Sequence, residues 1–231
     1  MRELPIPFST PMVRAILDGN KTMTRRIVKP QPPDEAKTLC GPKTYEPIAI
    51  DKDGEMYPGS PIYGAYDENG EWGIKCPYQP GDHLYVRETW RCVKYDNMDG
   101  DLNYGVEFKD GTRKYFKFDD SERYHQFGKY ALKKGWQPSI YLPKEAARIW
   151  LEITNVRVER LQEITEEDAR AEGCKVYEGG YVFPGTSYDK IGLCHGSPEM
   201  AFQVMWGELY PNSDTNPWVW VISFKKVTPC S

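Results

Sequence analysis

Residue types that could do chemistry gather in one short stretch, GNKTMTRR, over residues 19–26. A glycine such as Gly19 can end a helix in the left-handed conformation and turn the chain sharply. We therefore predict a tight loop from which the side chains of Lys21, Thr24 and Arg26 converge on a single cavity. The alternative interpretation of the same lysine, threonine and arginine run is a solvated loop without chemistry.

A short helix is predicted to position this stretch. Ser9 is a helix-capping residue type, and Pro11 suits the first helical turn. Apolar residues then recur at three- and four-residue spacing, at Met12, Ala15 and Ile16. The helix is expected to end at Gly19, so that the basic residues follow it directly.

The same stretch carries a family resemblance. Gly19, Lys21 and Arg26 fit the pattern G-x-K-x-x-x-x-R, which resembles the motif of the ASCH domain, a relative of the PUA RNA-binding fold. Three further segments resemble family elements in the family order: a G-D-x-L-x-V strand at 81–86, a long strand and short acidic helix at 150–173, and a closing strand at Trp218–Val227. The resemblance implies an α+β, mainly β fold, namely a PUA-like closed β-barrel with short helices packed at its ends.

We predict a single domain over residues 1–228, because 231 residues can bury a self-sufficient core. Compared with small members of the family, the chain carries insertions near 31–75, 92–138 and 175–196. These inserted hairpins and loops are expected to surround the pocket.

Turn signals predict hairpins in the first two insertions. Asp53-Gly54 and Asn69-Gly70 favour a hairpin in which 45–51 pairs with 71–75. In the second insertion, 105–108 and 113–118 are predicted to pair around Asp110-Gly111. The third insertion is rich in glycine and tyrosine and is predicted to be a loop.

Periodicity predicts the elements between the insertions. Alternation of side chains indicates strands at 83–90 and 149–161. Thr165 is expected to cap a short acidic helix, and Ser197 an amphipathic helix whose apolar stripe faces the core.

The resemblance also implies an activity. Small bacterial ASCH proteins hydrolyse the amide of N4-acetylcytidine with a lysine and a threonine of the loop motif and a glutamate of the acidic helix, roles that fall here on Lys21, Thr24 and Glu172. Such a reaction needs a base for water, a donor for the oxyanion and a proton for the leaving amine. We favour lysine as base or electrostatic donor over a covalent acyl-lysine, because an acyl-lysine is itself an amide.

Four charged residues are assigned to substrate binding. Arg25 and Arg26 lie in the motif, and the planar guanidinium of Arg26 suits a phosphate or a base carbonyl, or equally an ion pair with Glu172. Arg87 and Glu88 fall on opposite faces of the strand at 83–90 and are expected at the rim of a cleft. The first hypothesis is thus an amidohydrolase acting on an N4-acylcytidine-like nucleoside.

Two other function classes stay open. Large ASCH proteins of this form resemble ones encoded in phages and prophages, and other members look like single-strand ribonucleases or RNA-binding modules. The chain could be a non-catalytic binder of single-stranded RNA or a ribonuclease of phage origin, with aromatic residues of the first insertion as stacking platforms or as packing groups. A phage factor that acts only through protein contacts is the third interpretation.

Composition limits the partners and the compartment. A net charge of -4 argues against wholesale wrapping of nucleic acid, so any such contact should be local. No apolar run resembles a signal peptide or a membrane span, which predicts a cytoplasmic protein without a membrane partner. The six cysteines should then be reduced thiols, and Cys194-His195 lacks the spacing of a zinc knuckle. We expect no metal, no cofactor, and a monomer or weak dimer.

Overall fold

The computed structural model describes residues 1–33, 36–68, 72–93, 103–118, 120–133, 135–211 and 216–228. Strands predominate over helices in these residues, so the predicted α+β, mainly β class is confirmed. Among the described strands, no sheet closes into a barrel. None of the described helices is long and apolar enough to cross a membrane.

The chain divides into two compact units. Unit 1 comprises Met1–Asp18, Asp82–Glu152 and Lys226–Ser231, and unit 2 comprises Gly19–Gly81 and Ile153–Lys225. The GNKTMTRR stretch therefore belongs to unit 2. The assignment of residues 1–228 to a single domain stays a prediction.

Unit 1 begins with a strand and a helix and continues with four strands, a helix and two 3-10 turns. Its elements are β1 (Glu3–Pro7), α1 (Thr10–Leu17), β8 (His83–Arg87), β9 (Trp90–Val93), β10 (Asn103–Phe108), β11 (Arg113–Lys117), α2 (Ser121–Ala131), η1 (Ser139–Tyr141) and η2 (Lys144–Ala146). Strand β1 pairs in parallel with β8, and β8 pairs antiparallel with the start of β12 (Trp150–Arg160). The helix predicted before Gly19 is confirmed as α1, and Gly19 follows it with a φ of 77°.

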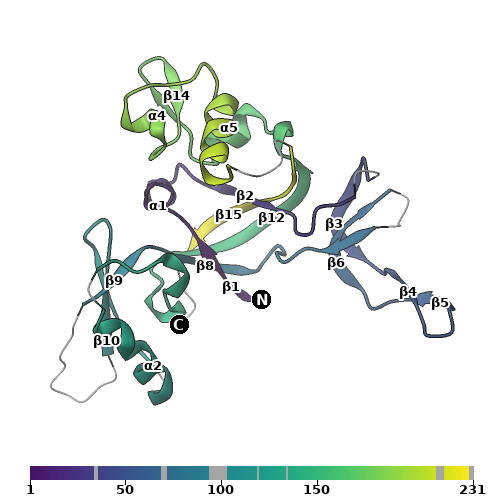
Figure 1. The fold of residues 1–231 in the computed structure, drawn as a ribbon, viewed down its shortest axis with the longest axis horizontal. Helices are drawn as coiled ribbons and strands as arrows, with labels where there is room; N and C mark the ends of the chain where they lie inside the picture. Colours follow the sequence, from purple (N-terminus) through teal and green to yellow (C-terminus); the bar gives the residue numbers. More distant parts are fainter. Residues whose placement is uncertain are drawn as a thin grey trace. The chain divides into compact units, whose positions relative to one another are not determined.

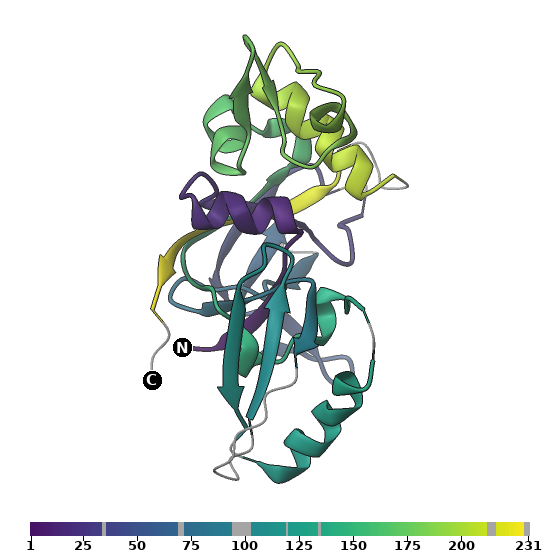
Figure 2. The same ribbon diagram turned by 90° about the vertical axis from the view of Figure 1, so that its left-hand side faces the viewer.

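The core of unit 1 lies between α2 and a three-stranded sheet with the order β11-β10-β9 (Figures 1 and 2). The predicted hairpin around Asp110-Gly111 is confirmed as β10–β11, with a φ of 86° at Gly111. Helix α2 was not predicted; it begins where the Asp120 side chain accepts a hydrogen bond from the Glu122 backbone N–H. Its buried Phe127 stacks on Trp90, with ring centroids 5.2 Å apart.

Unit 2 contains most of the short strands and three helices. Its elements are β2 (Met23–Ile27), β3 (Leu39–Tyr45), β4 (Ile48–Ile50), β5 (Met56–Pro58), β6 (Ile62–Asp67), β7 (Gly73–Lys75), the greater part of β12, η3 (Leu161–Glu163), α3 (Glu166–Ala171), β13 (Lys175–Tyr177), β14 (Gly180–Val182), α4 (Ser187–Lys190), α5 (Pro198–Leu209) and most of β15 (Trp218–Val227). Within this unit, β15 lies between β12 and β2 (Figure 1).

Strand β2 corrects the prediction of a tight loop over residues 19–26. The strand starts at Met23 and pairs antiparallel with β15, so that Thr24 lies opposite Ile222 and Arg26 opposite Trp220. Successive side chains of a strand point to opposite faces. Thr24 and Arg26 therefore share one face of β2, and Arg25 lies on the other.

The insertions of unit 2 hold more regular structure than the sequence indicated. The turn at Asp53-Gly54 is confirmed, but it joins β4 to β5, and β7 pairs with β6 rather than with 45–51. The second predicted turn, Asn69-Gly70, lies outside the described residues. The segment 175–196, predicted to be a loop, contains the β13–β14 hairpin and α4.

Both predicted helix caps of unit 2 are confirmed. The Thr165 side chain accepts a hydrogen bond from the Asp168 backbone N–H at the start of α3. The Ser197 side chain accepts one from the Met200 backbone N–H at the start of α5. These caps satisfy backbone donors that a helix leaves unpaired at its N-terminus. Helix α3 is thereby held so that its last turn leads directly to Glu172.

The stacked core of unit 1 gives a stability prediction. We expect Phe127→Ala to lower the free energy of unfolding by about 3–5 kcal/mol, because it leaves a cavity beneath Trp90. Leu132→Ala is the control, since that side chain at the end of α2 is 86% exposed. Urea denaturation followed by tryptophan fluorescence measures both. Equal losses in the two variants would contradict the placement of Phe127 in the core.

Candidate functional site

Lys21 and Glu172 meet inside unit 2 although 151 positions separate them in the sequence. The Lys21 Nζ donates hydrogen bonds to Glu172 Oε2 at 2.5 Å and to the Glu172 backbone oxygen at 2.8 Å. Each residue is only 3% exposed. The Thr22 backbone N–H also donates to the Ala171 oxygen at 2.8 Å, which fixes the motif against the end of α3. The structure thus brings together two of the three predicted catalytic residues.

Arg25 extends this pair into a buried charge cluster. Its Nη2 donates to Glu159 Oε1 and to Asp168 Oδ2, each at 2.6 Å, and its Nη1 lies 3.5 Å from Glu172 Oε1. Arg157 adds a third cation through contacts with Glu159 and Asp168. Arg25 is 1% exposed, and its guanidinium lies over the ring of Phe202 in α5. Arg25 therefore holds carboxylates of the protein, which differs from its predicted role in substrate binding.

The electrostatics of Lys21 combine opposing effects. Burial lowers the pKa of Lys21 below its ordinary value of 10.5, and the charges of Arg26 and Arg25 lower this pKa further, while the Glu172 carboxylate raises it. The net direction is downward because the amine is almost fully removed from water. A lysine of lowered pKa yields a neutral amine at a lower pH than an exposed lysine does.

Thr24 and Arg26 form a second contact on the opposite face of β2 from Arg25. Arg26 Nη1 donates to Thr24 Oγ1 at 2.6 Å and to the Arg25 backbone oxygen at 2.8 Å. A hydroxyl that accepts a hydrogen bond keeps its own O–H as a donor. Thr24 is 2% exposed, so Arg26 is the more accessible of the two.

Arg26 also lines a pocket of about 230 Å³ in unit 2. The lining residues, which include three cations and two aromatic side chains, are Arg26, Ile27, Lys29, Lys75, Pro77, Tyr78 and Trp220. We name this hollow the cationic pocket. Burial raises the pKa of the Tyr78 phenol above 10.0, with Arg26 opposing, so the phenol stays neutral at physiological pH.

Arg87 and Glu88 belong to unit 1, where both have protein partners. Arg87 donates to the Ile140 backbone oxygen at 2.9 Å, and its guanidinium lies over the Tyr85 ring. Glu88 is 4% exposed and binds Arg148 through both carboxylate oxygens, at 2.9 and 2.6 Å. Burial raises the pKa of Glu88, and Arg148 opposes that change. Both residues thus have partners within unit 1, and their role in substrate binding stays a prediction.

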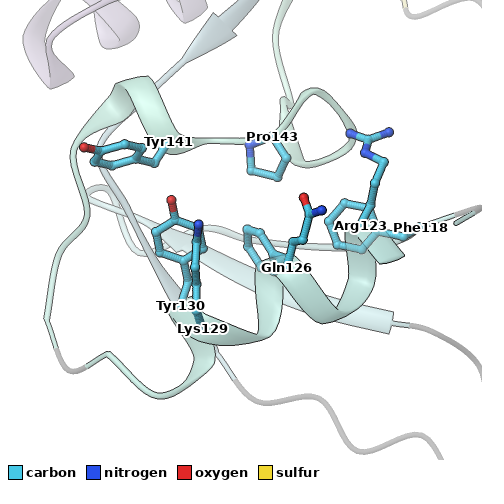
Figure 3. A pocket seen from close by; sticks show the side chains of 8 residues that line it. Phe118, Arg123, Gln126, Lys129, Tyr130, Tyr141 and Pro143 are labelled. Carbon is cyan, nitrogen blue, oxygen red and sulfur yellow. The ribbon is translucent and has the colours of Figure 1, made fainter. Parts of the chain in front are cut away.

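A second hollow, of about 180 Å³, lies in unit 1 beside α2. Figure 3 shows Tyr141 and Pro143 facing Tyr130 and Gln126 of α2 across it. Its Arg123 is already paired with Glu145 at 2.5 Å. This aromatic pocket is lined by two cations, Arg123 and Lys129, whereas the cationic pocket is lined by three.

Two aromatic residues of the first insertion pack on each other. Tyr45 and Tyr66 lie with ring centroids 4.8 Å apart, and Lys43 lies over the Tyr66 ring. For these two rings the contacts favour the packing interpretation over the stacking one. Tyr57 on the β4–β5 hairpin is 50% exposed.

The described residues contain no group of three or more histidine, cysteine or acidic side chains placed to hold a metal. Five cysteines there are free thiols, and burial raises the pKa of Cys174 to about 11. Cys230, the sixth, lies outside the described residues.

Sequence reasoning missed the acidic partners of Arg25 and the far wall of the cationic pocket. In the sequence, Asp168 is one of several acidic residues of the short helix after Thr165, and Glu159 lies in the alternating strand at 149–161; neither pattern indicates a contact with Arg25. Lys75 ends the first insertion and Pro77 and Tyr78 follow it directly, and no sequence pattern linked these residues to the motif. Their proximity to Arg26 arises from the tertiary fold.

In comparison with known proteins, no family model, no curated protein and no solved structure matches the chain.

The contacts of the charge cluster predict that the loss of Arg25 strongly lowers the stability of the protein. Arg25→Ala should lower the free energy of unfolding by about 3–5 kcal/mol, because Glu159, Asp168 and Glu172 would be left with less compensation. Arg170→Ala is the matched control, because Arg170 is exposed on α3, where it pairs with Glu166 and hydrogen-bonds the Tyr181 phenol; its loss should lower stability far less than the loss of Arg25. Urea denaturation of both variants measures the difference. A small effect at Arg25 would mean that water reaches the cluster.

Proposed function

We propose that this chain is an amidohydrolase that removes an acyl group from the exocyclic amine of a cytosine-like base. The observation that carries the proposal is the buried contact of 2.5 Å between Lys21 Nζ and Glu172 Oε2, in which burial lowers the lysine pKa. A perturbed lysine beside a carboxylate is an arrangement that enzymes use for proton transfer. Lys21, Thr24 and Glu172 are the proposed catalytic residues.

The proposed reaction uses water as the nucleophile. Neutral Lys21 takes one proton from water as the oxygen attacks the acyl carbon, and Glu172 stabilises the resulting ammonium. Arg26 hydrogen-bonds Thr24, and its charge is close enough to Lys21 to lower the pKa of that lysine. In the proposed reaction the Thr24 hydroxyl therefore donates to the carbonyl oxygen, which becomes negative in the tetrahedral intermediate. When the C–N bond breaks, the Lys21 ammonium returns the proton to the leaving amine. The products are a carboxylic acid and the free base amine, so atoms and protons balance.

Arg26 is proposed to control the access of the substrate to Lys21 and Thr24. Lys21 and Thr24 are 3% and 2% exposed, so a neighbouring side chain must move before a substrate carbonyl reaches them. Arg26 contacts Thr24 on one side and lines the cationic pocket on the other. A substrate that bound the Arg26 guanidinium from the pocket would draw it away from Thr24.

The proposal includes membership of the ASCH family and its PUA-like relationship. Support comes from the order β12-β15-β2 in unit 2, where the motif strand β2 pairs with the strand resembling the family's closing strand. Closure of the strands into a barrel stays a prediction of the resemblance. So does a cytoplasmic, monomeric or weakly dimeric protein that needs no metal or cofactor.

A second candidate is a non-catalytic binder of single-stranded RNA. The near-complete burial of Lys21 favours it, because a buried ion pair can also serve only to hold α3 against the motif. The cationic pocket would then be the binding surface. Binding of short oligonucleotides without turnover of any acylated nucleoside would favour this candidate, and a ribonuclease would reveal itself by cleaving them.

The pH dependence of turnover tests the role of Lys21. A base must be unprotonated, so kcat/KM for N4-acetylcytidine should rise with pH, with a midpoint below 10.5 because burial lowers the Lys21 pKa. Glu172 raises this pKa, so Glu172→Gln should move the midpoint to lower pH while it slows the reaction. Chromatography of released cytidine measures both profiles. An unmoved midpoint would exclude Lys21 as the titrating group.

Substitution of Lys21 distinguishes a lysine that acts as a base from one that acts only as a positive charge. Lys21→Arg keeps a positive charge but cannot deprotonate at these pH values, so turnover should vanish. Lys175→Arg is the matched control, because Lys175 is exposed in β13. Circular dichroism and nucleoside binding by Lys21→Arg show whether the variant is folded. If a folded Lys21→Arg variant retained turnover, Glu172 and not Lys21 would be the group that transfers the proton.

A further inference from the structure

The cationic pocket carries a strong excess of positive charge. Arg26, Lys29 and Lys75 line it, and none of its described lining residues is acidic. Lys29 and Lys75 are exposed, whereas Arg26 is half-buried and held by Thr24 and the Arg25 backbone oxygen. One oriented guanidinium with two mobile ammonium groups suits a compact anion with several oxygens, since arginine binds phosphate through its planar fork and lysine as a point charge.

The remaining walls suit a flat ring. Trp220 is 2% exposed and closes the inner side of the pocket, while Tyr78 is half-buried. A neutral phenol does not repel an anion, and its ring can stack on a base or pack on a ribose. A volume of about 230 Å³ falls below the roughly 300–1,000 Å³ of pockets that enclose a whole drug-sized ligand. The pocket therefore fits part of a nucleotide-sized ligand.

We infer that the cationic pocket binds the phosphate of a nucleotide, so that the substrate is a phosphorylated acylcytosine nucleotide and not the free nucleoside. This inference rests on the proposed function and adds its substrate class. Arg26 joins the two parts, because it lines the pocket and hydrogen-bonds Thr24. A phosphate on Arg26 would place the nucleotide next to Thr24, whose hydroxyl keeps its own O–H as a donor.

The experiment compares N4-acetylcytidine with its 5′-monophosphate by isothermal titration calorimetry and by kcat/KM. One charge-assisted contact is worth tenfold or more in affinity, so the monophosphate should bind at least about tenfold tighter. Lys75→Gln and Lys29→Gln should each remove most of this preference, because each substitution removes one of the cations that line the pocket, and both lysines are exposed. Lys175→Gln, an exposed lysine outside the pocket, should preserve the preference.

The outcomes separate this inference from the proposed function. Equal affinity for nucleoside and monophosphate, or a preference that survives both lysine substitutions, would overturn the inference, even if the nucleoside is hydrolysed. A phosphate preference that depends on Lys29 and Lys75, with no release of cytidine from either compound, would support the pocket assignment and overturn the amidohydrolase proposal. Inorganic phosphate that competes with the monophosphate at millimolar concentration would support the anion site directly.

Discussion

The burial of Arg25 is the constraint on which unit 2 depends. A guanidinium that is 1% exposed must be surrounded by carboxylates, because removing a charge from water costs several kcal/mol unless partners replace the solvent. Three cations, Lys21, Arg25 and Arg157, meet three carboxylates, Glu159, Asp168 and Glu172. The cluster ties β2, β12 and α3 together. It also sets the field in which the Lys21 amine titrates.

Much of the fold followed from local patterns. Helices α3 and α5 and strands β8, β12 and β15 lie close to their predicted positions, because capping residues and apolar periodicity act over a few positions. Helix α2 was not predicted, because its residues are mostly polar and Phe127 is the single buried side chain of the helix, so no apolar periodicity marks it. The loop predicted at the motif proved to be strand β2, whose extended shape comes from pairing with β15, almost 200 residues later.

Less of the candidate site than of the fold could be predicted from the sequence. The family resemblance placed Lys21 and Glu172 together, and the structure brings them into contact. The resemblance gave no information about Glu159 or about Tyr78, because their neighbours in space lie far away in the sequence. Charged residues such as Arg87 and Glu88 looked equally suited to a cleft, yet the bidentate contact of Glu88 with Arg148 serves packing. Whether such a residue binds a ligand or another residue of the protein depends on charged residues far away in the sequence, and the periodicity of the sequence does not predict these pairs.

The alternation along β2 has a consequence for how this motif can change in length. Arg25 faces the buried cluster and Arg26 the opposite side only because of the parity of their positions in the strand. Inserting or deleting one residue between Thr22 and Arg25 would exchange the two faces, as any odd slip in a strand does. It would turn Arg25 out of its carboxylate shell and turn Arg26 away from the cationic pocket. Related chains should therefore tolerate substitutions in this segment far better than single-residue insertions or deletions. The insertions and deletions that they do tolerate should be two residues long.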